Sequence, residues 1–164
     1  MKKIPLTQGK VAVVDDEDYD WLIEWKWSYA DYPNCGAFRN QLKGESEDIS
    51  LKMHRAIWER HNGPIPEDLL INFIDGNGLN NKKQNLRLAT WSQSQWNQKP
   101  RTGCTSQYKG VAWQDTKWRS KIKLNGKQIH LGYFDDEKEA ARTYNKAALT
   151  YFGEFAQLNE IEKD

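Results

Sequence analysis

Two strand-like segments joined by Asn125-Gly126 place the strongest constraint on the fold of this chain. The segments "KWRSKIKL" and "KQIHLGYF" flank these residues, and an Asn-Gly pair in that position is a strong signal for a two-residue β-hairpin. Upstream, "YKGVAW" predicts a further strand. Downstream, "DDEKEAARTYNKAALTYFG" predicts a helix that Asp136 can cap, with Glu139 completing a capping box. We therefore expect a three-stranded antiparallel sheet backed by one helix over residues 108–160.

The predicted strand "KWRSKIKL" has two chemically different faces, because side chains alternate along a strand. One face is expected against the helix and carries Trp118, Ser120, Ile122 and Leu124. The other face carries cations at three successive positions, Arg119, Lys121 and Lys123, and we expect it to include Lys117, Lys109 and Gln114. Such a face can lie in the major groove of DNA, or it can be an ordinary solvated surface.

Charge is distributed unevenly along the chain. The 164 residues together carry a formal net charge of only +1. Residues 99–130 nevertheless contain 8 basic side chains and a single acidic one, whereas residues 1–50 contain 6 basic and 10 acidic ones. A local positive field attracts a polyanion even when the total charge is near zero. Charge alone leaves a nucleic-acid interface and a solvated lysine-rich surface equally open.

The first part of the chain predicts a small α+β region followed by a ββα unit, so the expected class is α+β. Residues 10–14 predict a short strand, and "DDEDYDWLIEWKW" predicts an amphipathic helix capped by Asp15 or Asp16. A hairpin and a second helix, "LKMHRAIWERHNG", follow. Residues 70–97 then predict a strand, a tight glycine turn, the strand "LRLAT" and a helix. The expected division is a domain over residues 1–98, a linker over 99–107 and a domain over 108–160.

Cysteine usage and hydropathy bound the location of the protein. The two cysteines, Cys35 and Cys104, form no Cys-x-x-Cys motif, and the chain has only 3 histidines. We therefore expect free thiols in a reducing compartment and no structural zinc site. Met1 is followed by polar residues rather than a signal peptide, and no apolar run approaches the roughly 20 residues of a membrane-spanning helix. The expected location is the cytoplasm, away from membranes.

The segment from "YKGVAW" to "AQLN" resembles the AP2/ERF-type DNA-binding domain. The shared motifs are "YKGV", W-R-x-x-I, the "LGYF" block and the alanine-rich helix ending in "YFGEFAQLN". In that family the sheet enters the major groove and contacts bases mainly through Arg and Trp. The resemblance implies DNA contacts from Lys109, Trp113, Gln114, Lys117, Arg119, Lys121, Lys123, Gln128 and His130. Plant members commonly have Arg or Trp at the positions of Ala112, Gln114, Gln128 and His130, which leaves the target sequence open.

The rest of the chain resembles phage-type HNH homing endonucleases, many of which carry the same C-terminal AP2 domain. The motifs are "GKVAVVDDEDYDWL", "MHRAIW", "GPIP", "IDGNGLNNKKQNLRLAT" and "SQSQWN", in that order. In this family an Asp-His pair ends the first strand of the ββα unit, and the helix supplies a later Asn or His. Oxygen ligands hold one divalent metal at the scissile phosphate, and the histidine activates water as general base.

All three implied active-site positions depart from the family pattern. Aligned on "IDGNGLNN", Asn72 stands at the Asp position, Phe73 at the His position and Ser94 at the position of the helix ligand. A neutral amide is a poor ligand for a hard cation, and a phenyl ring accepts no proton. The scaffold residues of the motif remain, among them Arg87, which we count as a DNA contact. The sequence therefore predicts a degenerate site without catalytic residues, bound metal or other cofactor.

Three other residues are candidates for a rebuilt site. Asp75 supplies a carboxylate, but its place in the turn favours bonds to backbone amides. His54 lies in the "MHR" element, where a structural or phosphate-contacting role is favoured, and His61 lies beside a helix end. A working site would need compensation at all three lost positions.

These features lead to three functional hypotheses. The first is a monomeric, sequence-specific binder of double-stranded DNA from a phage or mobile element. It would act in the cytoplasm of a bacterial host by occupying a site, as a repressor, an origin or promoter blocker, or a competitor of a related nuclease. The alternative is a nicking or homing endonuclease that uses Mg²⁺ or Mn²⁺ at an atypical site. The third is an inhibitor that binds another protein. Engineered and natural loss of the three residues are both open.

Overall fold

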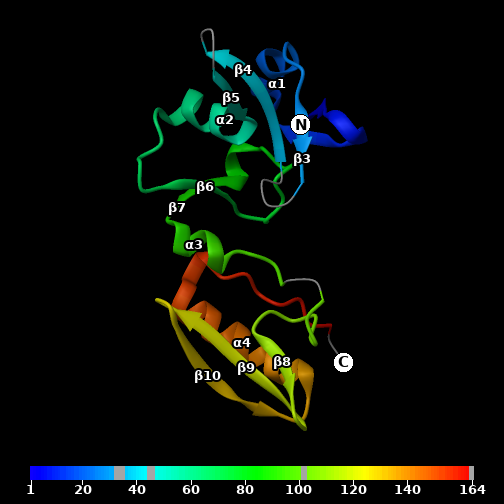
Figure 1. Ribbon diagram of the computed structural model, residues 1–164, viewed down its shortest axis with the longest axis vertical. Helices are drawn as coiled ribbons and strands as arrows, with labels where there is room; N and C mark the ends of the chain where they lie inside the picture. Colours follow the sequence, from blue (N-terminus) through cyan, green and yellow to red (C-terminus); the bar gives the residue numbers. More distant parts are fainter. Residues whose placement is uncertain (32–35, 44–46, 101–102, 163–164) are drawn as a thin grey trace. The chain divides into compact units, whose positions relative to one another are not determined.

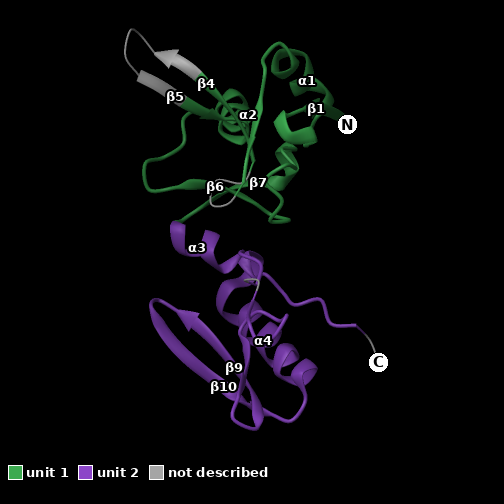
Figure 2. Ribbon diagram, turned by 45° about the vertical axis from the view of Figure 1, so that its right-hand side comes forward, with its two compact units in different colours: residues 1–90 green, residues 91–164 purple. Residues whose placement is uncertain are grey.

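The computed structural model describes residues 1–31, 36–43, 47–100 and 103–162 as an α+β protein with small antiparallel sheets, which confirms the predicted fold class (Figure 1). The chain divides into two compact units, unit 1 over residues 1–90 and unit 2 over residues 91–164 (Figure 2). Cys35 and Arg101 lie outside the described residues. The domain and linker boundaries drawn from the sequence stay a prediction.

Unit 1 combines three antiparallel sheets with two helices. Its sheets are β1 (Lys2–Pro5) with β2 (Val11–Val14), then β3 (Ser28–Ala30), β4 (Gly36–Lys43) and β5 (Glu47–Lys52) in that order, and β6 (Leu70–Phe73) with β7 (Leu86–Ala89). Its helices are α1 (Asp16–Ile23) and α2 (Met53–Asn62), and its 3₁₀ turns are η1 (Thr7–Gly9) and η2 (Lys83–Asn85).

One apolar cluster holds these elements of unit 1 together. Alternate residues of β2 point inward, since Ala12 and Val14 are buried while Val11 is exposed. The cluster also takes in Leu22 of α1, and Met53 and Ile57 of α2, all without exposed surface. The spacing of Met53 and Ile57 puts both on one face of the helix, as predicted from the "MHRAIW" motif. The ββα strands therefore rest on a core to which the N-terminal region contributes most.

Helix α1 is shorter than the sequence pattern predicts. It ends at Ile23, and Trp27, which was expected on its apolar face, lies beyond it and is 2% exposed. The Trp27 indole N–H donates to the carbonyl of Leu22 at 2.8 Å, which satisfies an oxygen at the end of the helix. Asp15 is the N-cap residue, as predicted, but its side chain caps nothing in α1. The expectation of a longer helix was wrong because Trp27 reaches the core from the following loop.

The N-terminal region is bonded directly to the loop between β6 and β7. The Asp15 carboxylate accepts from the backbone N–H of Lys83 at 2.9 Å, at the start of η2. The backbone of Val13 accepts from Asn81 and donates to Leu79, both at 2.8 Å. Lys83 also forms an ion pair with Glu17. These contacts hold the ββα loop against β2 and α1.

Unit 2 is a three-stranded antiparallel sheet with one long helix. It contains α3 (Trp91–Trp96), β8 (Val111–Gln114), β9 (Lys117–Leu124), β10 (Lys127–Phe134), α4 (Glu137–Phe152) and the 3₁₀ turn η3 (Gly153–Phe155). The strand order is β10-β9-β8, and the β9–β10 turn consists of Asn125 and Gly126, both with positive φ. The predicted hairpin is confirmed. The predicted sheet backed by one helix is confirmed as well, since α4 contacts all three strands.

Helix α4 begins and packs as its sequence predicts. The Asp136 carboxylate accepts from the backbone N–H groups of Lys138 and Glu139, which satisfies two free donors at the helix start. Its buried face carries Ala140, Ala141, Tyr144, Ala148 and Phe152. Small alanines let the helix approach the sheet closely.

The glycine of the "YKGV" motif has a steric explanation. A Cβ on Gly110 would lie 2.1 Å from the Tyr144 ring and 2.6 Å from the carbonyl oxygen of Lys121, and its φ of +77° also favours glycine. The described helices include none that is both long and apolar enough to cross a bilayer.

Candidate nucleic-acid interface

The strand register places the predicted cationic residues of β9 on one face of the sheet in unit 2. Residues directly opposite each other on antiparallel strands share a face. Lys117 pairs with Gln114, Arg119 with Ala112 and Tyr133, Lys121 with His130, and Lys123 with Gln128. We call this set the outer face, and its members are Ala112, Gln114, Lys117, Arg119, Lys121, Lys123, Gln128, His130 and Tyr133. On the opposite face, Ser120 and Ile122 are buried, as expected for residues next to α4.

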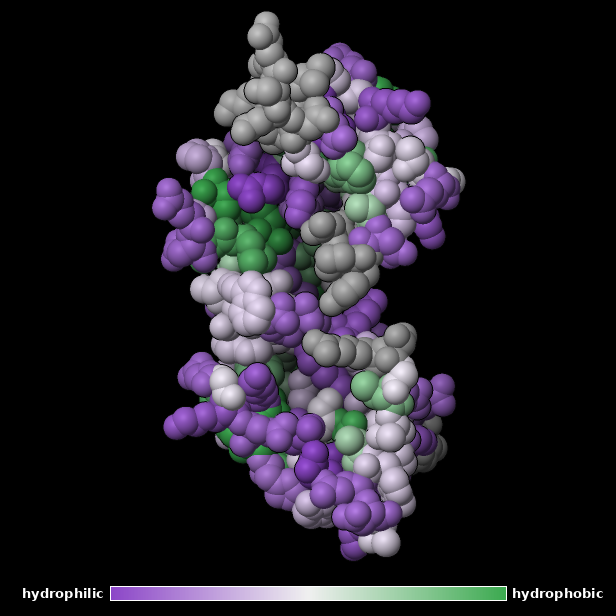
Figure 3. Space-filling model, in the orientation of Figure 1, coloured by the Kyte–Doolittle hydropathy of each residue, from purple (hydrophilic) through white to green (hydrophobic). Residues whose placement is uncertain are grey.

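The cations of the outer face are mostly left without acidic partners. Lys117 forms an ion pair with the exposed Asp135 at 3.1 Å, and exposed pairs of this kind are weak. Among the described residues, Arg119, Lys121 and Lys123 form no ion pair. In the view of Figure 3, hydrophilic side chains cover most of the surface over β9 and β10. The outer face is therefore a concentrated positive surface.

Trp113 was predicted as a DNA contact, but it lies on the other face of the sheet. It pairs with Trp118 across β8 and β9, and the two rings meet edge to face with their centroids 4.9 Å apart. Trp113 is 46% exposed because it sits near the end of the sheet. Its side chain is thus separated from the outer-face cations by the sheet itself.

Lys109 also differs from its expected placement. It precedes β8, and its ammonium group donates to the carbonyl oxygens of Trp96 and Gln98 at 2.5 and 2.6 Å. Burial lowers the pKa of Lys109 to about 8. Its backbone N–H donates to the Asn159 side chain. Lys109 therefore ties the segment after α3 to the sheet rather than projecting from the outer face.

Tyr133 is an outer-face residue that the sequence pattern did not reveal. Strict alternation from Gln128 would direct Tyr133 toward the helix, but a β-bulge between His130 and Gly132 shifts the register. Tyr133 is consequently 51% exposed, its ring lies 4.7 Å from that of His130, and Phe134 packs in the core instead. An isolated glycine inside a strand is a known signal for a bulge, so Gly132 was the available clue.

In the ββα unit, Asn72 and Arg87 form a cross-strand pair. They are directly opposite in β6 and β7, and the Arg87 Nε donates to the Asn72 Oδ1 at 3.1 Å. Asn72 is only 8% exposed. The side-chain oxygen of Asn72 is the atom that could bind a cation, and it already accepts a hydrogen bond from Arg87.

Phe73 occupies the implied position of the general base, next to His54 of α2. The two rings meet edge to face, with centroids 5.0 Å apart and an interplanar angle of 72°. Burial, followed by the nearby charges of Lys52 and Arg55, lowers the pKa of His54 to about 4. His54 is therefore neutral at pH 7 and packs against the Phe73 ring at the end of β6.

Ser94, the third implied position, lies in α3 and is half-buried. Helix α3 belongs to unit 2, whereas Asn72 and Phe73 belong to unit 1.

Asp75 organises the turn after β6, as the sequence predicts. Its carboxylate accepts from the Asn77 backbone and from the side chains of Asn80 and Asn85, at 2.7 to 2.9 Å. The side-chain oxygen of Asn85 in turn accepts a hydrogen bond from the Asp75 backbone N–H. The carboxylate and the amides of the turn bond to one another, which explains why the turn motif contains both.

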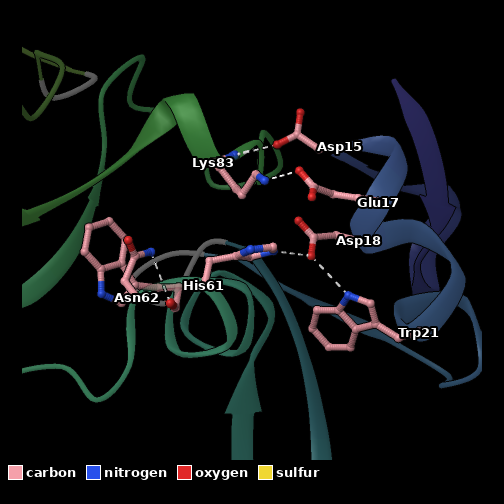
Figure 4. Close-up of polar contacts among 8 residues, drawn as sticks. Asp15, Glu17, Asp18, Trp21, His61, Asn62 and Lys83 are labelled. Atoms are coloured by element: carbon pink, nitrogen blue, oxygen red, sulfur yellow. Dashed lines mark hydrogen bonds and ion pairs between the residues drawn. The ribbon is translucent and has the colours of Figure 1, made fainter.

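His61 points away from the ββα strands and contacts α1. Its Nε2 lies 2.7 Å from the carboxylate of Asp18, which has no exposed surface and also accepts from the Trp21 indole (Figure 4). Within the described ranges, no group of three or more His, Cys, Asp or Glu side chains could hold a metal ion. The donor set around Asn72 and Phe73 therefore does not fit the metal of an HNH site.

Several known proteins are similar to this chain. The family model described as HNH endonuclease matches residues 51–95, which run from β5 to α3. An uncharacterized HNH endonuclease of Acanthamoeba polyphaga mimivirus is 35% identical over 160 residues, covering 94% of this chain and 78% of its own length. Protein 3.8 of Escherichia phage T7 is 42% identical over 109 residues, covering 65% of this chain and 89% of its own length.

A second kind of relative matches a shorter stretch. An AP2-like ethylene-responsive transcription factor of Arabidopsis thaliana is 40% identical over 55 residues, covering 34% of this chain and 13% of its own length. These matches fall in the C-terminal part of the chain. No solved structure matches the chain. On the extent of the viral and phage similarities, the chain belongs to the HNH endonuclease family.

Proposed function

We propose that the protein binds double-stranded DNA through the outer face of unit 2. The observation that carries this proposal is the register, which gathers Arg119, Lys121 and Lys123 on one side of a sheet without acidic neighbours. A sheet face can enter the major groove, where cations contact phosphates and polar side chains read base edges. The partial likeness to AP2-like transcription factors supports the same mode of binding.

The outer face also suggests which residues would select a sequence. Arg119 lies on the middle strand and can donate two parallel hydrogen bonds to a guanine. Gln114 and Gln128 carry amides of the kind that pair with adenine. His130 and Tyr133 form an exposed aromatic pair on β10, suited to apolar contact with a thymine methyl group or to a phosphate contact.

A charge-reversal experiment tests DNA binding. Replacing Lys121→Glu and Lys123→Glu should weaken duplex binding by at least about 100-fold and flatten its salt dependence, because fewer counterions are released. A matched control is Lys127→Glu with Lys146→Glu, which makes the same change in net charge away from the outer face. Equal losses in both variants, measured by fluorescence anisotropy, would mean that the face has no special role.

We further propose that the protein does not cleave DNA and acts by occupying its site. The support lies in the ββα unit, where the amide of Asn72 accepts from Arg87 and Phe73 offers no proton acceptor. Loss of a general base alone lowers a rate by about 10²–10⁴-fold, and loss of the metal charge lowers it further. Repression, blocking of an origin or promoter, and competition with a related nuclease in a phage or mobile element all follow from occupancy.

A cleavage assay separates this proposal from its alternative, a nicking endonuclease with an atypical site, which family membership favours. Supercoiled DNA that carries the target should stay supercoiled with Mg²⁺ or Mn²⁺ and a molar excess of protein. Relaxed or linear product formed over many turnovers by the purified protein, and not by a His54→Phe variant, would establish the alternative. Absence of any duplex binding would favour the third hypothesis, a protein-binding inhibitor.

A further inference from the structure

Unit 2 contains a pocket of about 360 Å³ that shares Lys123 with the outer face. It is bounded by α3, by the β9–β10 turn and by the face of α4 that carries Tyr144 and Phe152. Its volume is within the range of about 300–1,000 Å³ that is usual for small-molecule sites. Apart from Lys123, the DNA-binding proposal makes no use of the residues that line this pocket.

The walls of the pocket are largely aromatic. Trp91, at the start of α3, is 68% exposed, compared with 49% for Trp25 and 46% for Trp113. At the other end of the helix, Trp96 stacks on Phe152 with centroids 4.6 Å apart and an interplanar angle of 11°. The stack fixes α3 against α4. A planar ligand could therefore stack on the exposed ring of Trp91 and pack against the rigid pair formed by Trp96 and Phe152.

Cations and neutral amides supply the polar groups of the pocket. Lys109 and Lys123 line it together with Gln95 and Asn125, and none of the described residues that line it is acidic. The Lys109 ammonium group gives two of its three hydrogens to the carbonyl oxygens of Trp96 and Gln98. The third hydrogen is available for an anionic ligand. The pocket therefore favours a ligand that carries both negative charge and a flat ring.

The open edge of β9 adds a backbone donor and acceptor. The pairing of β8 with β9 ends at Val111 and Ser120, and one more bond joins the Lys121 N–H to the Gly110 carbonyl oxygen. Alternate residues of a strand direct their N–H and C=O groups to the same side. The amide of Lys123 thus points toward the side that β8 leaves uncovered, where the pocket lies. An uncovered strand edge can bond the edge of a heterocyclic ring.

We propose that this pocket binds a single nucleotide, with its base on Trp91, its base edge at the Lys123 backbone and its phosphate at the two lysines. The choice of a nucleotide among aromatic anions rests on the proposed DNA binding. Two sources share this chemistry, a free nucleoside monophosphate and an unpaired nucleotide of a bound DNA strand. Stacking on an aromatic ring tolerates any base, so we expect little preference among the bases.

The test uses the full chain labelled with 5-fluorotryptophan and followed by ¹⁹F NMR. The chain has 8 tryptophans, and the Trp91 resonance is assigned by its disappearance in Trp91→Ala. The probes are dAMP, dTMP, inorganic phosphate, a perfect duplex and the same duplex with one bulged nucleotide. We expect dAMP and dTMP, or the bulged duplex alone, to shift the Trp91 resonance, while the perfect duplex leaves it in place.

Two variants decide the outcome. Trp91→Ala should weaken binding of the probe that shifts this resonance by about 10-fold. The matched control Trp25→Ala, a tryptophan of unit 1 that is 49% exposed, should leave it unchanged. A shift by dAMP identifies the free nucleotide as a ligand, and a shift by the bulged duplex alone identifies the DNA strand.

Three results would overturn the inference. They are no shift with dAMP, dTMP or the bulged duplex, an affinity for inorganic phosphate equal to that of a mononucleotide that binds, and equal losses in Trp91→Ala and Trp25→Ala. Because binding of the perfect duplex is measured in parallel and depends on the outer face, failure of the pocket and failure of the proposed function give different results.

Discussion

The ββα unit and the outer face are both rich in polar side chains, yet these side chains are used in different ways. In the ββα unit, Asp75, Asn80 and Asn85 bond to one another, and Asn72 bonds to Arg87. On the outer face, Lys121 and Lys123 stand opposite His130 and Gln128 without a carboxylate partner among the described residues. Polar groups that form hydrogen bonds with each other stabilise a fold. Cations on a sheet without acidic partners instead create a positive field that attracts an anionic ligand.

This difference shows that the framework of the ββα unit does not depend on the residues at its implied active site. The hydrogen bonds that join Asp75 to Asn77 and Asn85 do not involve Asn72 or Phe73. The charge of the outer face depends on a separate sheet with its own core. Each region can therefore be altered without altering the other, and the following variants test that independence.

The largest effect is expected for Asn85→Ala in the ββα unit. Asn85 is 7% exposed, and its side chain bonds to the Asp75 N–H, the Asp75 carboxylate and the Asn80 carbonyl. Its removal leaves these groups unpaired and should lower the free energy of unfolding by about 3 kcal/mol, as measured by urea denaturation. Asn77→Ala, an exposed position in the same turn, should cost about 1 kcal/mol or less. If Asn85→Ala also weakened duplex binding at low temperature, the two regions would be coupled.

A pH dependence of stability comes next in size and should arise from His54. Its pKa is lowered from 6.5 to about 4 in the folded state, so the unfolded state takes up the proton first as the pH falls. The stabilisation is complete above about pH 6.5 and should be lost between there and pH 4, by at most about 3 kcal/mol. His54→Phe should flatten this part of the curve, and His130→Phe on the outer face should leave it in place.

Neighbouring residues of β10 provide a sharper comparison within unit 2. Phe134→Ala removes a ring from the core and should lower the free energy of unfolding by about 2 kcal/mol. Tyr133→Ala should change it by less than about 0.5 kcal/mol but weaken DNA binding several-fold. The reverse pattern, seen in calorimetry and anisotropy, would place the β-bulge elsewhere.

The smallest effect concerns the salt dependence of binding. Lys121→Ala removes one phosphate contact and should reduce the slope of log affinity against log salt by about 0.9. Lys127→Ala, on the other face of the same hairpin, should leave the slope unchanged. A slope that is equal in both variants would indicate diffuse attraction rather than contacts made by the outer face.

Much of unit 2 could be predicted because its signals are local. The Asn125-Gly126 turn, the Asp136 cap and the alternation of Arg119, Lys121 and Lys123 each depend on residues close in sequence. Tyr133 was missed because a single extra residue in a strand reverses the alternation after it. The DNA contact of Trp113 stays a prediction, because the family resemblance names positions, whereas the register decides faces and pairs Trp113 with Trp118.

Contacts between distant residues could not be predicted from the sequence. The ammonium group of Lys109 donates to the carbonyl oxygens of Trp96 and Gln98. A lysine that was expected on the cationic face of the sheet therefore holds the backbone at the end of α3 instead. Asp15 was recognised as a helix cap, but its carboxylate bonds to a residue 68 positions later. At the implied nuclease site, the sequence identified the altered residues, while the packing of Phe73 on His54 required the fold.

The bonds from Asp15 and Val13 to the loop of the ββα unit bear on how such genes exchange parts. The matched family segment begins at residue 51, yet its loop is held by backbone and side-chain groups near residue 14. A recombination event that transferred only the matched segment would leave the N–H of Lys83 and the backbone of Asn81 without their acceptors. A transferred segment that is to keep these bonds must therefore include residues 13–15 as well as the matched segment.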